Sequence, residues 1–257
     1  MSNASRRRRA RVVATTVGSI LALATVVAPA SARRVETGAV PRWRSAPHSL
    51  LAAPHRAADT LWRARVRAFA ESHLQHTAWG PAHGRRDYEL TLALARSEGI
   101  KVDDDALFAA GYLHDMGGLP PYAKEGVDHG DRGVQVVDSV LRETGFPMQK
   151  APLVKEIIGH HMYYRPPGTA PEAILFRDAD ILDFLGAIDV ARIVSLTTRE
   201  KFAPDLPHAI AVVEKNMQEM PEELQTRSAK LEAQHRIQEM QRFLDALRAE
   251  TDSLRAL

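Results

Sequence analysis

The sequence contains no cysteine among its 257 residues. Without cysteine the chain cannot form a disulfide, use a thiol nucleophile or bind a metal through thiolates. Any metal site must therefore be built from nitrogen and oxygen ligands. Internal repeats are also absent, which gives no support to a repeat architecture. The composition, 45% hydrophobic and 26% charged, is typical of a globular protein with one principal domain.

The first 32 residues have the three parts of a secretory signal peptide. Five arginines lie within residues 6–11, residues 12–28 carry no charge, and Ala30-Ser31-Ala32 has the small-x-small pattern of a cleavage site. We therefore expect export, with the mature chain beginning near Arg33 and no stable membrane insertion after cleavage. An uncleaved anchor is the alternative, but Pro29 and several polar residues make the segment a poor one. The general secretory and twin-arginine routes both stay open.

The charge balance changes once this segment is removed. The whole chain has a formal charge of +2 and a pI near 9.0. Without the five N-terminal arginines, 29 basic residues remain against 32 acidic ones, so the mature chain is near −3. The basic pI is therefore no argument for nucleic-acid binding, and we expect none.

The spacing of apolar residues predicts an all-α fold. Residues 33–57 show no sustained period and contain three prolines, so we interpret them as a linker or an irregular N-terminal arm. From Ala58 onward, apolar residues recur at helical spacing and do not alternate over a useful length. We expect a main domain over 58–200 and a C-terminal helical extension over 201–257. The expected helices cover 58–76, 84–99, a segment starting after Asp103 or Asp104, 128–145, 152–163, 171–186, 189–200 and a long stretch after Pro221.

One local motif places a histidine beside a carboxylate. The segment from Tyr112 to Gly117 reads YLHDMG, so His114 and Asp115 lie at the end of a mostly apolar helix. A buried unpaired carboxylate is costly, and it needs a cation or several hydrogen-bond donors. The pair alone is equally typical of a histidine hydrogen-bonded within a C-terminal turn.

Other histidines strengthen the interpretation as a metal site. Helical wheels turn His83, His114 and His129 toward the core, while His161 lies within an apolar stripe and His160 lies at its edge. Inward histidines from several helices, with carboxylates nearby, are most readily accommodated around a metal. Surface positions are expected for His73, His76, His208 and His235.

The ordered set of these motifs resembles the HD-domain superfamily of metal-dependent phosphohydrolases. The resemblance spans about residues 58–200 and rests on His83 and His129 together with three segments, LHDMG from Leu113, IIGHH from Ile157 and DADILDFLGA from Asp178. It implies a helical bundle with a metal centre.

The resemblance also implies a ligand set. One metal would be bound by His83, His114, Asp115 and Asp180. A second would take the positions of His129, His160 and, as a further candidate, His161. Asp115 would then be the catalytic carboxylate, either bridging the metals or orienting a water molecule.

The helical wheel and the family pattern disagree on whether Asp178 or Asp180 is the metal ligand. The wheel of the expected 171–186 helix puts Asp178 on the apolar side with Ile181 and puts Asp180 on the other side. The family pattern of Ala-Asp-x-Leu matches Asp180 instead. We follow the family pattern.

The chain departs from the family in places. His83-Gly84-Arg85-Arg86-Asp87 stands where the family often has His-x-x-Arg-Val. Asp87 is one turn after His83, so we expect it either to orient that histidine or to pair with Arg86 at the surface. No Gly-Tyr-Pro follows His160-His161, so the cyclic-dinucleotide phosphodiesterase subfamily is not indicated. Basic residues suited to binding a substrate phosphate are Arg86, Lys124, Arg132 and Arg192.

The resemblance implies hydrolysis of a small phosphoester, a nucleotide or another, by a metal-activated water. One or two divalent ions are expected, and histidine with carboxylate does not distinguish Fe, Mn, Co, Ni, Zn or Mg. Two alternatives remain, a di-iron oxygenase on the same scaffold and a non-catalytic HD-fold binding module.

Overall fold

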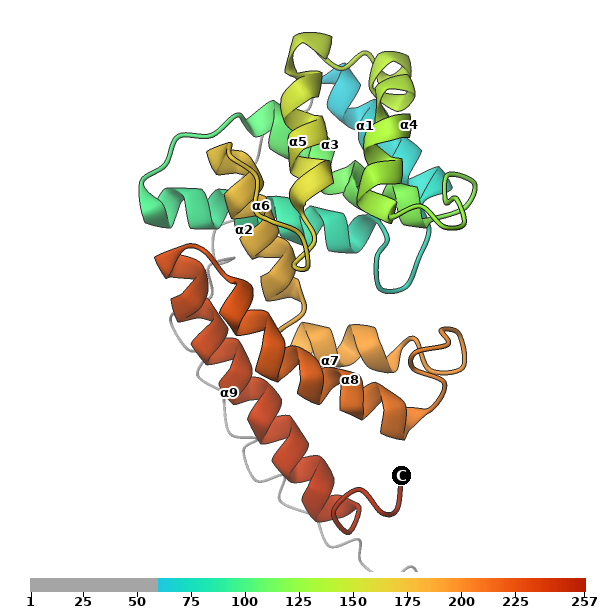
Figure 1. Ribbon diagram of the computed structural model, residues 1–257, viewed down its shortest axis with the longest axis vertical. Coiled ribbons are helices and arrows are strands. Elements are labelled where there is room, and N and C mark those ends of the chain that lie inside the picture. The colour runs from blue at the N-terminus through green and yellow to red at the C-terminus, as the bar shows by residue number, and fades with distance from the viewer. Residues whose placement is uncertain (1–59) are drawn as a thin grey trace, which may run out of the picture. The chain divides into compact units, whose positions relative to one another are not determined.

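The computed structural model describes residues 60–257, and this part of the chain contains helices and no strand (Figure 1). The all-α prediction is confirmed. The expected signal peptide and the segment 33–57 lie outside the described residues. No helix among those described is long and apolar enough to cross a membrane.

Nine α-helices and three short 3-10 helices are present in the described residues. They are α1 (Leu61–His73), α2 (Pro81–Glu98), α3 (Asp104–Leu113), η1 (His114–Gly118), α4 (His129–Thr144), η2 (Met148–Lys150), α5 (Ala151–His160), α6 (Pro171–Asp183), α7 (Ala187–Val194), α8 (Leu206–Glu219), η3 (Met220–Glu223) and α9 (Arg227–Glu250).

The helix boundaries follow local capping chemistry. The Asp103 carboxylate accepts hydrogen bonds from the first backbone N–H groups of α3, and Asp128 does the same for α4. Gly99 and Gly145 end α2 and α4 in the left-handed conformation that glycine adopts most easily. Helix α8 is not among the individual helices expected from the sequence. Its first turn contains Pro207, a position at which proline is compatible with a helix.

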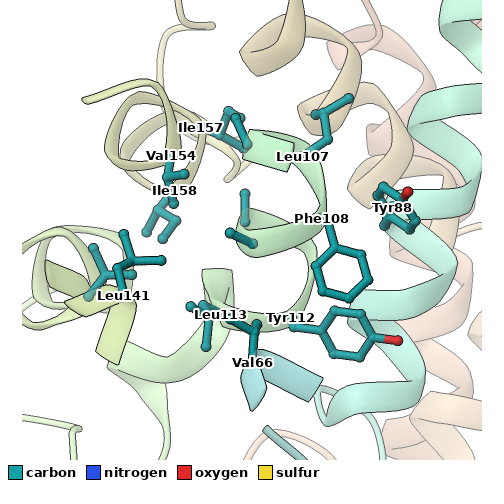
Figure 2. Close-up of a cluster of buried hydrophobic side chains, with 14 of the residues drawn as sticks. Val66, Tyr88, Leu107, Phe108, Tyr112, Leu113, Leu141, Val154, Ile157 and Ile158 are labelled. Atoms are coloured by element: carbon teal, nitrogen blue, oxygen red, sulfur yellow. The ribbon is translucent and has the colours of Figure 1, made fainter. Parts of the chain in front are cut away.

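Two hydrophobic clusters hold the helices together. In Figure 2, side chains of α3, α4 and α5 converge, with Leu113, Leu141 and Ile158 among them. The second cluster joins α7, α8 and α9 to the opposite sides of α2 and α6. Since α2 and α6 contribute to both clusters, they lie between two sets of helices: α1, α3, α4 and α5 on one side, and α7, α8 and α9 on the other (Figure 1).

A glycine pair lets α2 and α3 approach closely. A Cβ atom at Gly84 would lie 2.0 Å from the carbonyl oxygen of Gly111, and one at Gly111 would lie 2.8 Å from the Cβ of Tyr88. No side chain fits at this crossing. The close approach positions the histidines beside these two glycines, His83 on α2 and His114 just after α3.

Candidate metal centre

Five helical segments bring histidines and aspartates to one place. His83 lies in the first turn of α2, and His114 and Asp115 form the start of η1. The remaining three residues are His129 at the start of α4, His161 directly after α5 and Asp180 in α6. The predicted inward orientation of the histidines thus produces a single cluster.

Asp115 lies between two groups of histidines. Its Oδ2 atom is 3.5 Å from His83 Nε2 and 3.2 Å from His114 Nε2. Its Oδ1 atom is 3.6 Å from His129 Nε2 and 3.7 Å from His161 Nε2. One carboxylate therefore faces a histidine pair with each of its oxygens.

Asp180 completes the first group. Its Oδ1 atom lies 3.4 Å from His83 Nε2, and its side chain is buried. Burial opposes ionisation of Asp180, but its hydrogen bond with His83 and the nearby histidines hold its pKa below the usual range. Asp180 thus supplies a negatively charged oxygen to this side of the cluster.

The donor set fits a bound cation. The Nε2 atoms of His83 and His114 are 3.3 Å apart, and those of His129 and His161 are 3.1 Å apart. Two imidazole nitrogens that face each other so closely repel unless a proton or a metal lies between them. Asp87 is fully buried beside the first pair, and neither of its oxygens has a hydrogen-bond partner. These residues therefore fit a divalent metal bound through nitrogen and oxygen.

Hydrogen bonds on the outer nitrogens fix the orientation of three rings. His114 Nδ1 lies 3.1 Å from the Gly111 carbonyl oxygen, and His161 Nδ1 lies 2.6 Å from that of Ile158. A carbonyl only accepts, so each Nδ1 carries a proton, and Nε2 is the atom that faces the cluster and can give up its own proton to bind a metal. His83 Nδ1 is 2.7 Å from Asp183 Oδ2 and has the same orientation.

Burial and neighbouring charges shift the pKa values of Asp115 and Asp87 in opposite directions. Burial alone would raise the pKa of Asp115, but the charge of His114 and hydrogen bonds from the surrounding histidines hold that pKa well below its usual range. Burial raises the pKa of Asp87 well above its usual range; His83 offsets part of this effect, while Asp183 and Asp180 add to it. Asp115 therefore stays ionised at the centre, as does Asp180, whereas ionisation of Asp87 is disfavoured.

Asp183 anchors His83 and two arginines at once. Arg86 donates to both carboxylate oxygens of Asp183 at 2.8 Å, and Arg192 donates to Oδ2 at 2.6 Å. Asp87, the partner that the sequence suggests for His83, has its Oδ2 3.1 Å from His83 Nδ1, but no hydrogen bond forms there. The role of Asp183 was not predicted from the sequence, although its position one turn after Asp180 places it on the same side of α6.

We expect Asp183→Asn to weaken metal binding without removing a ligand. Loss of the negative charge frees the His83 ring and leaves two arginines uncompensated, so metal affinity should fall about 10- to 100-fold and the free energy of unfolding by about 3 kcal/mol. Metal titration and chemical denaturation measure the two effects. Asp245→Asn, which removes an exposed carboxylate paired with Arg248, is the control. Unchanged metal affinity in Asp183→Asn would show that His83 is oriented by other contacts.

The two competing aspartates face opposite sides of α6. Asp180 faces the histidines, whereas Asp178 accepts hydrogen bonds from the backbone N–H groups of Gln225 and Thr226 and from the Thr226 hydroxyl. Both are buried because α6 is covered on both sides. A helical wheel assumes one solvent-facing side, and that assumption does not hold for this helix.

Several residues singled out from the sequence lie away from the cluster. The His160 ring does not join it: His160 Nδ1 lies 3.0 Å from the carbonyl oxygen of Pro166. Arg132 donates to the Tyr122 carbonyl at 2.7 Å, and Lys124 is exposed in the loop before α4. The structure therefore places His161, and not His160, with the other histidines. Of the four expected surface histidines, His76 is half-buried and the other three are exposed, namely His73, His208 and His235.

A cavity of about 480 Å³ opens beside the cluster. His83, Asp115, His129 and Asp180 form part of its wall. The other lining residues are Trp79, Gly118, Met162, Tyr163, Phe184, Ile193, Phe202, Val212, Lys215, Asn216 and Met220. None of the four arginines and lysines proposed from the sequence lines it. Helix α8, which the sequence analysis did not anticipate, contributes Val212, Lys215 and Asn216.

Comparison with known proteins identifies the scaffold. Residues 82–185 match the family model of the HD domain. A search of curated proteins found no match.

Solved structures give the same fold. One from Lactobacillus plantarum is 22% identical, with a TM-score of 0.53, and the match covers 76% of this chain and 98% of that one. A predicted HD superfamily hydrolase from an uncultured Thermotogales bacterium is 24% identical, with a TM-score of 0.51 and coverage of 74% and 90%. Bacillus subtilis YpgQ in complex with ADP is 20% identical, with a TM-score of 0.53 and coverage of 73% and 97%. Residues 82–185 therefore form an HD domain.

Proposed function

We propose that this protein is a metal-dependent hydrolase of small phosphate esters. The observation that carries the proposal is the position of Asp115, whose two carboxylate oxygens face two different histidine pairs at the wall of a cavity. A carboxylate in this position can hold two cations beside a substrate. Phosphoryl chemistry needs such concentrated positive charge.

The residues of the cluster have distinct roles in this proposal. His83, His114 and Asp180 would hold one cation, His129 and His161 would hold a second, and Asp115 would contribute one oxygen to each. Bound cations would supply a water molecule of lowered pKa and neutralise charge on the phosphate. The backbone carbonyls that hold His114 and His161 already turn their Nε2 atoms toward Asp115, so these two rings need not reorient before binding.

The substrate belongs to the class of small phosphoesters. The structural relative YpgQ was solved in complex with ADP, which supports a phosphate-bearing ligand for this protein. The cavity volume also falls in the range of about 300–1,000 Å³ that small-molecule pockets occupy. We further propose that the protein acts after export, on the strength of the signal-peptide pattern in residues 1–32.

Removal and replacement of the metal tests the proposed function. The full chain is stripped with a chelator, and manganese, iron, cobalt, nickel, zinc and magnesium are added separately before assay with phosphomonoesters and nucleotides. We expect no turnover in the stripped protein and restored hydrolysis with at least one of these metals.

Two other outcomes would replace the proposal. Oxygen uptake supported by ferrous iron, with no hydrolysis under any metal, would indicate a di-iron oxygenase. Tight metal binding without any turnover would indicate a binding module.

A further inference from the structure

The wall of the cavity beside the metal centre has a polar part and a larger apolar part. The metal-centre residues form most of the polar part. The remaining wall is mostly apolar and comes largely from Trp79, Phe184, Ile193, Phe202, Val212 and Met220. A ligand whose phosphate lies at the metal centre therefore places the rest of its structure against apolar side chains.

Positive charge is scarce along this wall. Among the lining residues in the described part of the chain, Lys215 is the one lysine or arginine. Its side chain is 59% exposed and its Nζ lies 3.7 Å from Glu219 Oε2. Arg86 and Arg192, two of the predicted phosphate-binding residues, are both bound to Asp183. A second or third phosphate on a ligand would thus find little positive charge beyond the metals.

Contacts with His76 and Arg192 hold two aromatic side chains of the wall, Trp79 and Phe184, in place. Trp79 stacks on His76 with the rings 5.3 Å apart, and its backbone N–H donates to His76 Nδ1 at 3.0 Å. The guanidinium of Arg192 lies 5.1 Å from the Trp79 ring and 4.8 Å from the Phe184 ring. Both rings are partly exposed and both line the cavity, so a preformed aromatic surface faces the ligand.

One polar side chain of this wall is already engaged, because the side-chain amide of Asn216 donates to buried Asp189 at 3.1 Å. The wall outside the metal centre is otherwise mostly apolar. The several hydroxyl groups of a sugar or a polyol would therefore lose more hydrogen bonds to water than this wall can replace.

We propose that the cavity selects phosphate esters of apolar, ring-containing alcohols, in preference to nucleoside polyphosphates and to esters of small polyols. This inference rests on the proposed function and names its substrate class. The metal centre binds the phosphate, and the wall formed by Trp79, Phe184, Phe202 and α8 binds the ring.

Binding of phosphonates tests the inference. Phosphonates are not hydrolysed, so differences in leaving-group reactivity do not affect the comparison. Calorimetry on the manganese-loaded full chain compares methylphosphonate, naphthylmethylphosphonate and the α,β-methylene analogue of ADP. The naphthyl compound should bind at least about 30-fold more tightly than methylphosphonate, because its ring buries apolar area. It should also bind more tightly than the ADP analogue.

Two variants locate the contact. Phe202→Ala and Val212→Glu should each weaken naphthylmethylphosphonate binding about tenfold and change methylphosphonate binding less than twofold. Both side chains are at least partly exposed, so the fold should tolerate the changes, and circular dichroism checks this. Phe243→Ala removes a partly exposed aromatic ring on α9 that does not line the cavity, and it should leave both affinities unchanged.

The outcomes separate this inference from the proposed function. Equal binding of the two phosphonates, tighter binding of the ADP analogue, or full affinity in both wall variants would overturn the inference even if hydrolysis occurs. Absence of hydrolysis with every metal would overturn the proposed function, whatever the binding contrast shows.

Discussion

Asp115→Asn is expected to reduce phosphate-ester hydrolysis by about a thousandfold or more while leaving the helical content unchanged. Asparagine has the size of aspartate but carries no negative charge, so it cannot bridge two cations or balance their charge. Rates measured at saturating metal, together with circular dichroism, check this expectation. Asp115 is only 19% exposed. The histidines that surround it remain in the variant, so we expect the fold to tolerate the change.

Asp138→Asn is the matched control for this change. Asp138 on α4 forms an ion pair at 3.0 Å with Lys155 on α5, and its replacement should alter the rate less than twofold. Retention of most of the activity by Asp115→Asn would show that the carboxylate does not bridge reacting cations, and would remove the observation on which the proposed function rests.

The two aspartates of α6 should respond in opposite ways to replacement by alanine. Asp180→Ala should lose bound metal and keep most of its stability, because Asp180 mainly faces other ligands. Asp178→Ala should keep its metal but lose about 3 kcal/mol in the free energy of unfolding, because the N–H groups of Gln225 and Thr226 lose their buried acceptor.

Elemental analysis and chemical denaturation of both variants measure these effects. Each variant serves as the control for the other, since both remove a buried carboxylate from the same helix. Metal loss in Asp178→Ala with retention in Asp180→Ala would show that the ligand was assigned to the wrong aspartate.

The fold could be predicted from the sequence because its signals are local. Helical periodicity, the Asp103 and Asp128 caps and the terminal Gly99 and Gly145 depend on neighbours within a few residues. Helix α8 could not be recognised in the same way. Its first turn contains Pro207, and a proline either starts a helix or interrupts one, depending on how the neighbouring segments pack.

Part of the candidate site could also be predicted from the sequence, but for a different reason. The order of His83, His114, Asp115, His129 and Asp180 matches a family pattern, and the structure brings these five residues together. A wheel gives only the direction in which a side chain points from its own helix.

Contacts between residues that are distant in the sequence could not be predicted. Arg86 and Arg192 lie 106 residues apart in the chain, yet Asp183 binds both. The pairing of a buried carboxylate with two cations depends on how three helical segments pack. For the same reason, the sequence could not show that His161 joins the cluster while His160 turns to Pro166.

The residues that line the cavity come from two separate parts of the chain, and this separation affects how substrate specificity can change between related proteins. The residues of the metal cluster lie between His83 and Asp180, within the segment that matches the HD domain, whereas Phe202, Val212 and Met220 lie after it. Sequence changes in α8 alter the shape of the cavity and leave every metal ligand in place. Two proteins with the same HD segment and different C-terminal helices would thus share their metal chemistry and differ in the molecules on which they act.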